Sequence, residues 1–496
     1  MSAAPVATPS LNRMRDRYDL IVVGTSFSAS FFLHRYLARS PAGARVLVLE
    51  RGAMNTHRWQ LDGGRQKLTA RAYRSIVNRN PEKEWVFLHT FGGNSNCWYA
   101  CTPRMLPDDF RLRSRFGVGV DWPVGYDELE PYYCDAEAIM QVAGPPNDDS
   151  PFPRSRPYPQ PPHRFTDVDR MFKKAYPDQL FVQPTARPTR ATATRPVCCA
   201  SATCHLCPID SKFTVLNELH GLYRDPRVTL ALEAPVQAVD VSGGTTATGV
   251  RYVKDGEERT ARGDLVVLGA NALFNPHILL RSGLAHPELG RGLGEQVGTE
   301  VVLHLDGVDN YGGSTWVIGH WYGLHGPDRR HERSAALVEL GNQPKLRTER
   351  GKWRQIVLMR VIFEDLRQPR NTVALDATDP SRPVVTYVGH SPYAQRGLDA
   401  LRPELERRLA PFPVEEMFVM PKLFSTESHI MGTTVMGNDP RTSIVDRYMV
   451  HHTVRNLVVL GSGGFPTFAP ANPTLTISAL ALRTADHVTG APKGLL

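Results

Sequence analysis

The sequence predicts an α/β protein in which a doubly wound, parallel sheet is joined to a largely antiparallel second lobe. The first observation is an apolar run over residues 18–24 that ends at Gly24 and is followed by helical spacing over residues 28–39. The second is another apolar run over residues 45–50. A strand, a helix and a strand in this order are typical of a parallel sheet covered by helices. This unit therefore predicts a Rossmann-type domain near the N-terminus.

Distant parts of the chain are expected to complete both halves. Residues 264–269 and 456–461 are apolar runs like the first two, so we expect the parallel sheet to be assembled from both ends of the chain. Between them, residues 300–425 alternate short β-like runs with turn residues, and this third observation predicts an antiparallel lobe. The clearest runs are Val301–His304, Ile356–Ile362 and Thr372–Leu375.

The composition is that of an ordinary globular protein and argues against several functions. Hydrophobic residues make up 41% and charged residues 22% of the 496 positions. The net charge of +8 is spread along the chain, without the basic run typical of a nucleic-acid-binding arm. No apolar stretch reaches the roughly 18–20 residues of a membrane-spanning helix. Residues 1–17 lack the apolar core of a signal peptide, so we expect a disordered lead and a cytoplasmic protein.

The first strand ends in a turn that is similar to a dinucleotide-binding loop. Gly24-Thr-Ser26-Phe-Ser-Ala29 keeps the first glycine of the Gly-x-Gly-x-x-Gly pattern and replaces the other two with small residues. The N–H groups at the start of the following helix attract a pyrophosphate. Glu50, after the second strand, is placed to accept hydrogen bonds from an adenosine ribose. We therefore predict that Gly24, Ser26, Ala29, Glu50 and Arg51 contact a dinucleotide.

Further blocks give the chain a family resemblance. Phe91-Gly-Gly-Asn-Ser-Asn-Cys-Trp98 with Thr102-Pro-Arg104, then residues 121–137, 428–446 and 464–485, resemble the glucose–methanol–choline (GMC) oxidoreductases in the family's own order. The similarity extends to pyranose oxidase-like members and to iron–sulfur-containing FAD sugar dehydrogenases. It implies a GMC fold, in which a Rossmann-type FAD-binding domain carries an antiparallel substrate-binding lobe.

The resemblance implies a catalytic pair, His429 and Asn472. The imidazole of His429 would take the hydroxyl proton of an alcohol while hydride leaves the carbon for the flavin N5. The amide of Asn472 would donate a hydrogen bond to the same oxygen. The neighbouring His451 and His452 match no family motif, and we expect them to be solvated.

The resemblance also assigns residues to FAD. These are Gly92, Gly93, Asn94, Asn96, Cys97, Trp98, Val236, Gly461, Ser462, Pro473 and Thr474. Cys97 stands where several sugar-oxidising relatives carry a histidine bonded covalently to the flavin, so either a cysteinyl link or non-covalent FAD is open here. Leu460 replaces a common acidic residue, so one cofactor hydrogen bond is expected from the backbone of Gly461 or Ser462.

A cysteine-rich segment suggests a metal site. Cys198, Cys199, Cys204 and Cys207 lie close together in one predicted loop and resemble the segment that holds an iron–sulfur cluster in some GMC dehydrogenases. A cluster of the 3Fe-4S or 4Fe-4S type, zinc, and no metal at all remain alternatives. A cluster would pass single electrons from the flavin to an acceptor protein. Without a cluster, the reduced flavin would pass two electrons to oxygen or a quinone.

The predicted function is FAD-dependent oxidation of a sugar or glycoside hydroxyl to a carbonyl. The alternatives are an oxidase of a non-sugar alcohol that uses oxygen, a flavoprotein lyase, and an electron-relay subunit. Expected partners are the small-molecule substrate, an electron-acceptor protein and a small accessory subunit, without nucleic acid. Aromatic residues that could stack on a sugar, or simply fill the core, are Trp316, Trp321, Tyr322 and Trp353.

The predicted domain boundaries follow the same blocks. The FAD-binding domain is expected in three parts, residues 18–143, 221–299 and 426–496, the last of which also carries the catalytic residues. Residues 144–220 are expected to form a Pro- and Arg-rich cover loop with the cysteine segment, and residues 300–425 the substrate-binding lobe.

Overall fold

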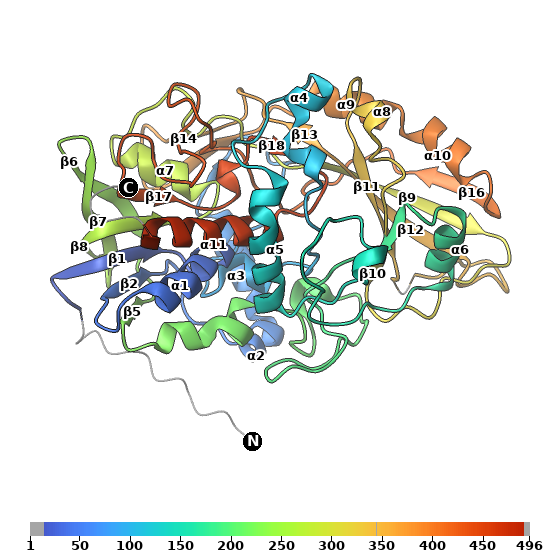
Figure 1. The fold of residues 1–496 in the computed structure, drawn as a ribbon, viewed down its shortest axis with the longest axis horizontal. Coiled ribbons are helices and arrows are strands. Elements are labelled where there is room, and N and C mark those ends of the chain that lie inside the picture. Colours follow the sequence, from blue (N-terminus) through green and yellow to red (C-terminus); the bar gives the residue numbers. More distant parts are fainter. Residues whose placement is uncertain (1–13, 344, 491–496) are drawn as a thin grey trace.

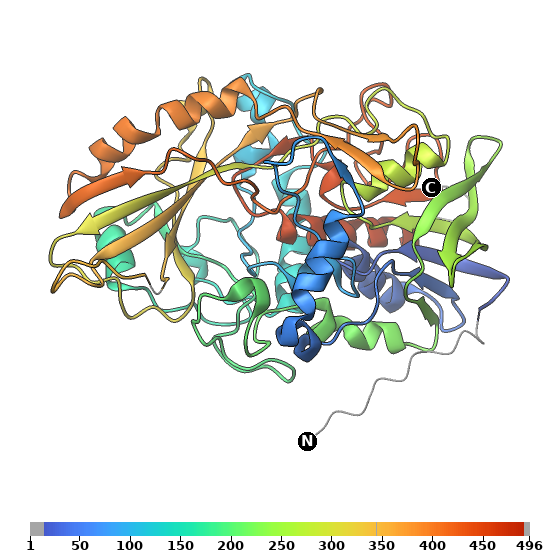
Figure 2. The ribbon, with the colours of Figure 1, turned by 180° about the vertical axis from the view of Figure 1, so that it is seen from behind.

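The computed structural model describes residues 14–343 and 345–490, with two sheets toward opposite ends of its long axis (Figures 1 and 2). Most of the expected N-terminal lead lies outside the described residues. Its last residue, Arg17, already begins strand β1 (Arg17–Val23). None of the described helices is long and apolar enough to cross a membrane.

The first sheet, called the mixed sheet, is built from both ends of the chain. Among the described residues it has seven strands in the order β5-β2-β1-β8-β7-β6, with β17 also paired to β8. Strands β5, β2, β1, β8 and β17 run parallel, whereas β6 and β7 add an antiparallel extension. The other bounds are β2 (Val46–Leu49), β5 (Val228–Ala231), β6 (Val236–Ser242), β7 (Thr246–Lys254), β8 (Glu257–Leu268) and β17 (Leu457–Val459). The predicted parallel order is confirmed.

Helices cover the mixed sheet where the sequence has helical apolar spacing. Helix α1 (Phe27–Arg39) buries Phe31, Phe32 and Leu33 and packs against α11 (Thr474–Gly490). Helix α11 in turn packs against α5 (Tyr126–Met140), which crosses the middle of the molecule in Figure 1. The burial of these apolar faces ties the C-terminal block to the N-terminal βαβ unit.

The second sheet, called the antiparallel sheet, forms the lobe. Its six strands among the described residues follow the order β16-β9-β12-β11-β10-β4. Their bounds are β16 (Val414–Val419), β9 (Val297–Leu305), β12 (Ile356–Phe363), β11 (Ala336–Gly341), β10 (Val317–Trp321) and β4 (Leu180–Val182). A separate apolar core, with Trp321, Val338 and Val361 fully buried, lies on one face of this sheet. The GMC-type fold class predicted from the sequence is confirmed.

Two segments differ from the sequence-based expectation. The predicted strand Thr372–Leu375 (β14) pairs with β15 (Pro383–Thr386), which in turn pairs with β3 (Val77–Asn78), in a small sheet outside the antiparallel sheet. The expected cover loop contains β4 and helix α6 (Asp167–Ala175). Helix α6 forms there because Thr166 and Asp169 cap it reciprocally, with each side chain accepting from the other's backbone N–H at 2.8–3.0 Å.

The remaining elements are short. The helices are α2 (His57–Trp59), α3 (Arg65–Tyr73), α4 (Leu112–Phe116), α7 (Phe274–Arg281), α8 (Pro327–Arg330), α9 (Pro392–Asp399) and α10 (Leu401–Leu409). Strand β13 (Asp365–Leu366) pairs with β18 (Thr467–Phe468) and so links the lobe to the C-terminal segment.

Candidate active site

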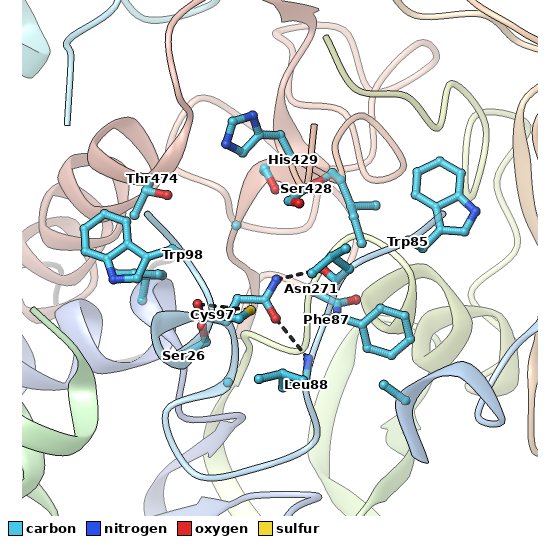
Figure 3. A pocket seen from close by; sticks show the side chains of 18 of the residues that line it. Ser26, Trp85, Phe87, Leu88, Cys97, Trp98, Asn271, Ser428, His429 and Thr474 are labelled. Carbon is cyan, nitrogen blue, oxygen red and sulfur yellow. Dashed lines mark hydrogen bonds between the residues drawn. The ribbon is translucent and has the colours of Figure 1, made fainter. Parts of the chain in front are cut away.

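A cavity of about 680 Å³ extends between the two sheets. One end is bordered by the Gly24 turn and Glu50, and the other by His429 and Asn472. Residues from β11 and β12 of the antiparallel sheet close its far wall. In the close view of Figure 3, Trp98 and Thr474 lie on one side of the cavity, Trp85 and Phe87 on the other, and His429 beyond them. A volume of this order suits a small-molecule or cofactor site.

Most residues predicted to bind FAD line this cavity. They are Gly24, Ser26, Glu50, Arg51, Gly93, Asn94, Cys97, Trp98, Val236, Gly461, Ser462, Pro473 and Thr474. Ala29, Gly92 and Asn96 do not border it. Ala29 faces Gly269 where α1 packs on the end of β8, and Asn96 donates to the backbone oxygens of Phe91 and Gly93. These three residues therefore lie behind the residues that line the cavity.

The Gly24 turn has a backbone that a side chain would disturb. Gly24 has φ = +95°, and a Cβ there would lie 2.7 Å from the carbonyl oxygen of Gly269. The chain then enters α1 at Ser26, so the first N–H groups of a 13-residue helix face the cavity. A strand end, a tight glycine turn and a helix N-terminus together form an anion-binding geometry.

Glu50 is held as a hydrogen-bond acceptor at the end of β2. Thr25 Oγ1 donates to Glu50 Oε2 at 2.6 Å, and the backbone N–H of Gly52 donates to Oε1 at 2.7 Å. Burial nevertheless raises the pKa of this carboxyl to about 7. A ligand hydroxyl that donates to Glu50 would offset this desolvation.

Cys97 sits beside two cations in the wall of the cavity. Burial raises the pKa of its thiol, although Arg65 and Lys212 oppose the shift. Lys212 Nζ donates to the backbone oxygens of Asn96 and Trp98, at 2.8 and 2.6 Å, and so fixes the segment on both sides of Cys97. A thiol with a raised pKa is a weak nucleophile, which favours non-covalent FAD over a cysteinyl link.

His429 is oriented by a residue that the sequence motifs do not include, Gln296. Gln296 Nε2 donates to the backbone oxygens of Ala469 (2.9 Å) and Ala471 (3.0 Å). Because carbonyl oxygens only accept, the other end of the amide, Oε1, must face His429 Nδ1 at 3.0 Å. Nδ1 therefore carries the proton, and Nε2 keeps its lone pair. No described residue hydrogen-bonds to Nε2.

The same imidazole is kept neutral. Burial and, to a lesser extent, the Arg360 guanidinium lower the pKa of His429 to about 3, although Glu339 opposes the shift. Asn472, which also borders the cavity, has a buried Oδ1 without a hydrogen-bond partner among the described residues. A neutral acceptor nitrogen and a side-chain amide thus border one cavity.

Glu295 holds the backbone of the loop that carries His429. Its carboxylate accepts from the N–H groups of Glu427 (2.9 Å) and His429 (3.1 Å), and it pairs with Lys83. Ser428, between those two residues, has φ = +62°, a conformation that costs energy for a residue with a side chain. The loop is therefore strained at the residue before His429, and Glu295 is what restrains it.

Two expectations about other side chains need correction. His451 is buried rather than solvated, because its Nδ1 accepts from the backbone N–H of Thr453 and Val454, and burial lowers its pKa to about 4. His452 is half-buried and bonds to Ser443 Oγ at 2.8 Å. Of the four aromatic candidates, Trp316 alone borders the cavity among the described residues; Trp321 is in the lobe core, Tyr322 is half-buried and Trp353 is exposed.

The predicted metal centre at Cys198, Cys199, Cys204 and Cys207 is not supported. All four border one small recess together with the cationic Arg187 and Lys212. Within the described residues, however, no three His, Cys, Asp or Glu side chains are placed to hold a metal ion. Cys198 Sγ instead contacts Thr315 Oγ1 at 3.3 Å, and Cys207 Sγ accepts from Ser211 N at 3.3 Å. The side chains do not fit a cluster, and Cys199 is exposed.

Sequence reasoning missed a group of charged and polar residues around His429. They are Glu295, Gln296, Glu339, Arg360 and Glu427. The signal for two of them was present: Glu339 and Arg360 each interrupt an apolar β-run at its centre. The other three lie outside such runs, so only the folded chain reveals them.

Comparison with known proteins shows similarity to the GMC oxidoreductases. Residues 368–481 match the family model described as GMC oxidoreductase. The chain is 26% identical over 538 aligned residues to the fructose dehydrogenase large subunit of Gluconobacter japonicus, covering 95% of this chain and 97% of that protein. The C-terminal part of the chain therefore resembles the GMC oxidoreductases, and nearly the whole chain is similar to a sugar dehydrogenase subunit. The chain is an FAD-dependent oxidoreductase.

Further comparisons agree with this GMC assignment. The 2-methyl-1,2-propanediol dehydrogenase of Mycolicibacterium austroafricanum is 26% identical, with 95% of each chain covered. The solved structure of pyridoxine 4-oxidase from Mesorbium loti has the same fold, with a TM-score of 0.64 at 16% identity, covering 96% of this chain and 100% of that one.

The cavity of this GMC protein fits FAD on its own geometry. A Cβ at Gly24 would clash with the carbonyl oxygen of Gly269, so only glycine permits the tight turn that brings the N-terminus of α1 to the cavity. Glu50, which follows the neighbouring strand β2, offers its carboxylate oxygens to the cavity. Thr474, at the N-terminus of α11, also borders the cavity. The residues at the two ends therefore match the two ends of a dinucleotide.

Proposed function

We propose that this protein oxidises a hydroxyl group of a sugar or glycoside to a carbonyl. The observation that carries the proposal is the unprotonated, unpartnered Nε2 of His429 in a cavity that also fits FAD. The names of the relatives, which include a fructose dehydrogenase and a diol dehydrogenase, support a hydroxylated substrate.

In this proposal the chain binds the alcohol and moves its proton. His429 Nε2 accepts the hydroxyl proton, since its Nδ1–H is committed to Gln296. Nδ2 of Asn472, a residue that borders the same cavity, donates a hydrogen bond to the same oxygen and stabilises its developing negative charge. When bound, FAD accepts the hydride that leaves the carbon. Gln296 is a positioning residue, because it bonds to His429 on one side and to the backbone beside Asn472 on the other.

An anaerobic reduction experiment tests this function. Sugars mixed with the holoenzyme should bleach the visible absorption band of the flavin, because hydride transfer needs no second substrate. The His429→Ala variant, loaded with FAD, should bleach about 10²- to 10⁴-fold more slowly, the usual contribution of a general base. A lyase or an electron-relay role would be favoured instead if the flavin stayed oxidised or if the variant matched the wild type.

Electron transfer beyond the flavin is a separate part of the proposal. We infer that the acceptor is a protein or a small oxidant that reaches reduced FAD through the cavity mouth. Stopped-flow reoxidation by oxygen, a quinone and a cytochrome should rank these acceptors, and equal slow rates with all three would contradict the inference.

A further inference from the structure

A row of charged and polar side chains crosses the antiparallel sheet next to the cavity. His320 on β10 is paired directly with Glu339 on β11, and Glu339 directly with Arg360 on β12. Residues opposite one another on neighbouring strands project from the same face. The strand neighbours of Glu339, Val338 and Leu340, are buried apolar residues of the lobe core on the other face.

Charges in the interior of a sheet are costly unless they are paired, and here the pairing is incomplete. Arg360 donates to Glu427 Oε2 at 2.7 Å instead of to Glu339, its cross-strand neighbour. Among the described residues, the ion-pair partner of Glu339 within 4 Å is His320, whose Nε2 lies 3.4 Å from Oε1, while Arg360 acts on Glu339 without a hydrogen bond. Glu339 Oε1, Glu427 Oε1 and Arg360 Nε are buried without a hydrogen-bond partner in the described structure. Leaving such groups unpaired destabilises the folded state, so their retention indicates a ligand.

These groups lie at the His429 end of the cavity. Glu339, Arg360 and Glu427 all border it, together with Tyr99 and Trp316. The charges of Arg360 and Glu339 are close enough to His429 to shift the pKa of its imidazole. A molecule placed with its reacting carbon beside His429 would therefore meet Glu339 and Arg360 with its other end.

The unused hydrogen-bonding capacity defines the chemistry of that other end. Two carboxylate groups offer spare acceptor oxygens, whereas a single guanidinium offers spare N–H groups. Hydroxyl groups can donate to the carboxylates and accept from the guanidinium, and an ammonium can only donate. A substrate carboxylate would face the negative charge of Glu339 and be repelled.

We propose that Glu339 and Arg360 bind the non-reacting hydroxyl groups of the substrate and thereby select neutral or amino-bearing polyols over sugar acids. This inference rests on the proposed function, since it names the substrate class of that same site. Glu339 and Arg360 act as specificity residues, and His429 remains the residue that takes the proton.

The test compares four probes that share a six-membered ring. D-glucose is neutral, D-glucosamine carries an ammonium, D-glucuronate carries a carboxylate, and cyclohexanol has a single hydroxyl. Anaerobic flavin reduction should give a kcat/KM at least 10-fold higher for glucose and glucosamine than for glucuronate or cyclohexanol. Glu339→Gln should lower kcat/KM for glucose by about 10- to 100-fold, the value of hydrogen bonds to a charged group, mainly through KM.

Two matched variants keep the test decisive. Glu300, on β9, is the next residue of the same row, since it lies opposite Arg360 of β12, but it does not border the cavity. Glu300→Gln should therefore leave kcat/KM for all four probes unchanged. In FAD-loaded His429→Ala, where turnover is slow, the dissociation constant of glucose read from the flavin spectrum should rise by the same factor when Glu339→Gln is added.

Four results would separate failure of this inference from failure of the function. The inference is overturned if cyclohexanol is oxidised as readily as glucose, or if Glu339→Gln slows both by one factor. It is also overturned if glucuronate is the preferred probe. If no probe reduces the flavin in the wild type while FAD is fully bound, the proposed sugar oxidation itself fails.

Discussion

At the residue scale, the candidate site depends on how one imidazole is held. The sequence motif identifies His429 and Asn472, but it says nothing of the tautomer or of the loop's restraint. Gln296 determines the tautomer, because its Nε2 donates to two backbone carbonyl oxygens and its Oε1 must then accept from Nδ1 of His429. Glu295 restrains the loop, because its carboxylate accepts from the backbone N–H groups of Glu427 and His429. These adjacent residues precede β9, far from His429 in sequence, so no local pattern reveals them.

The role of Gln296 predicts a change in pH dependence. With a His429 pKa of about 3, wild-type kcat/KM should show no loss from this group between pH 5 and 8. Gln296→Glu places a negative charge beside Nδ1 and favours the imidazolium, so the pKa of His429 rises and activity should fall on the acid side. The measurement is kcat/KM against pH for wild type, Gln296→Glu and Gln296→Leu.

The apolar variant is the control for this prediction. Gln296→Leu removes the hydrogen-bond acceptor without adding charge, so kcat should fall while the pH profile of kcat/KM keeps the wild-type shape. If both variants kept the wild-type pH profile with only a lower rate, Gln296 would have a structural role alone.

At the element scale, the βαβ unit presents its loop to the cofactor because three local features coincide. Strand β1 ends at Val23, Gly24 adopts a positive φ, and α1 begins at Phe27. The sequence pattern alone was a poor match to the dinucleotide fingerprint, since two of its three glycines are absent. The fold shows why Ala29 suffices: it packs at the end of β8 against Gly269, which has no side chain.

Gly24→Ala should therefore cost both stability and cofactor. The new Cβ would lie 2.7 Å from Gly269 O in a conformation that alone costs on the order of 1–3 kcal/mol outside glycine. We expect loss of FAD from the purified protein and a lower Tm, measured by the flavin-to-protein absorbance ratio and calorimetry. Gly43→Ala is the matched control, because Gly43 lies in an exposed turn with no atom within 4 Å of a Cβ. Full FAD content in Gly24→Ala would contradict the assignment of this turn.

At the scale of the whole molecule, the cavity exists only because two sheets are placed against each other. Its nucleotide end belongs to the mixed sheet and its far wall to β11 and β12 of the antiparallel sheet. The C-terminal segment contributes β17, Asn472 and α11, and so joins both ends of the chain at the site.

Removal of FAD is expected to destabilise both halves together. A ligand present at 100 times its Kd stabilises the native state by about 2.7 kcal/mol, and this one would contact both halves. Calorimetry of apoprotein and holoprotein should each show one transition, with the apoprotein unfolding at lower temperature. Two transitions, of which FAD shifts one alone, would show that the antiparallel sheet takes no part in holding the cofactor.

Local sequence patterns were enough to predict the fold class, the order of the βαβ unit and the blocks around Trp98, His429 and Asn472. These patterns are apolar periodicity, a turn that needs Gly24, and short motifs of adjacent residues. The folded chain was needed to show that His451 is buried, that the four clustered cysteines do not converge on a metal ion, and that Glu295, Gln296, Glu339 and Arg360 surround His429. Burial, hydrogen-bond partners and charge pairing depend on residues far apart in sequence, and the packing of the two sheets brings those residues together.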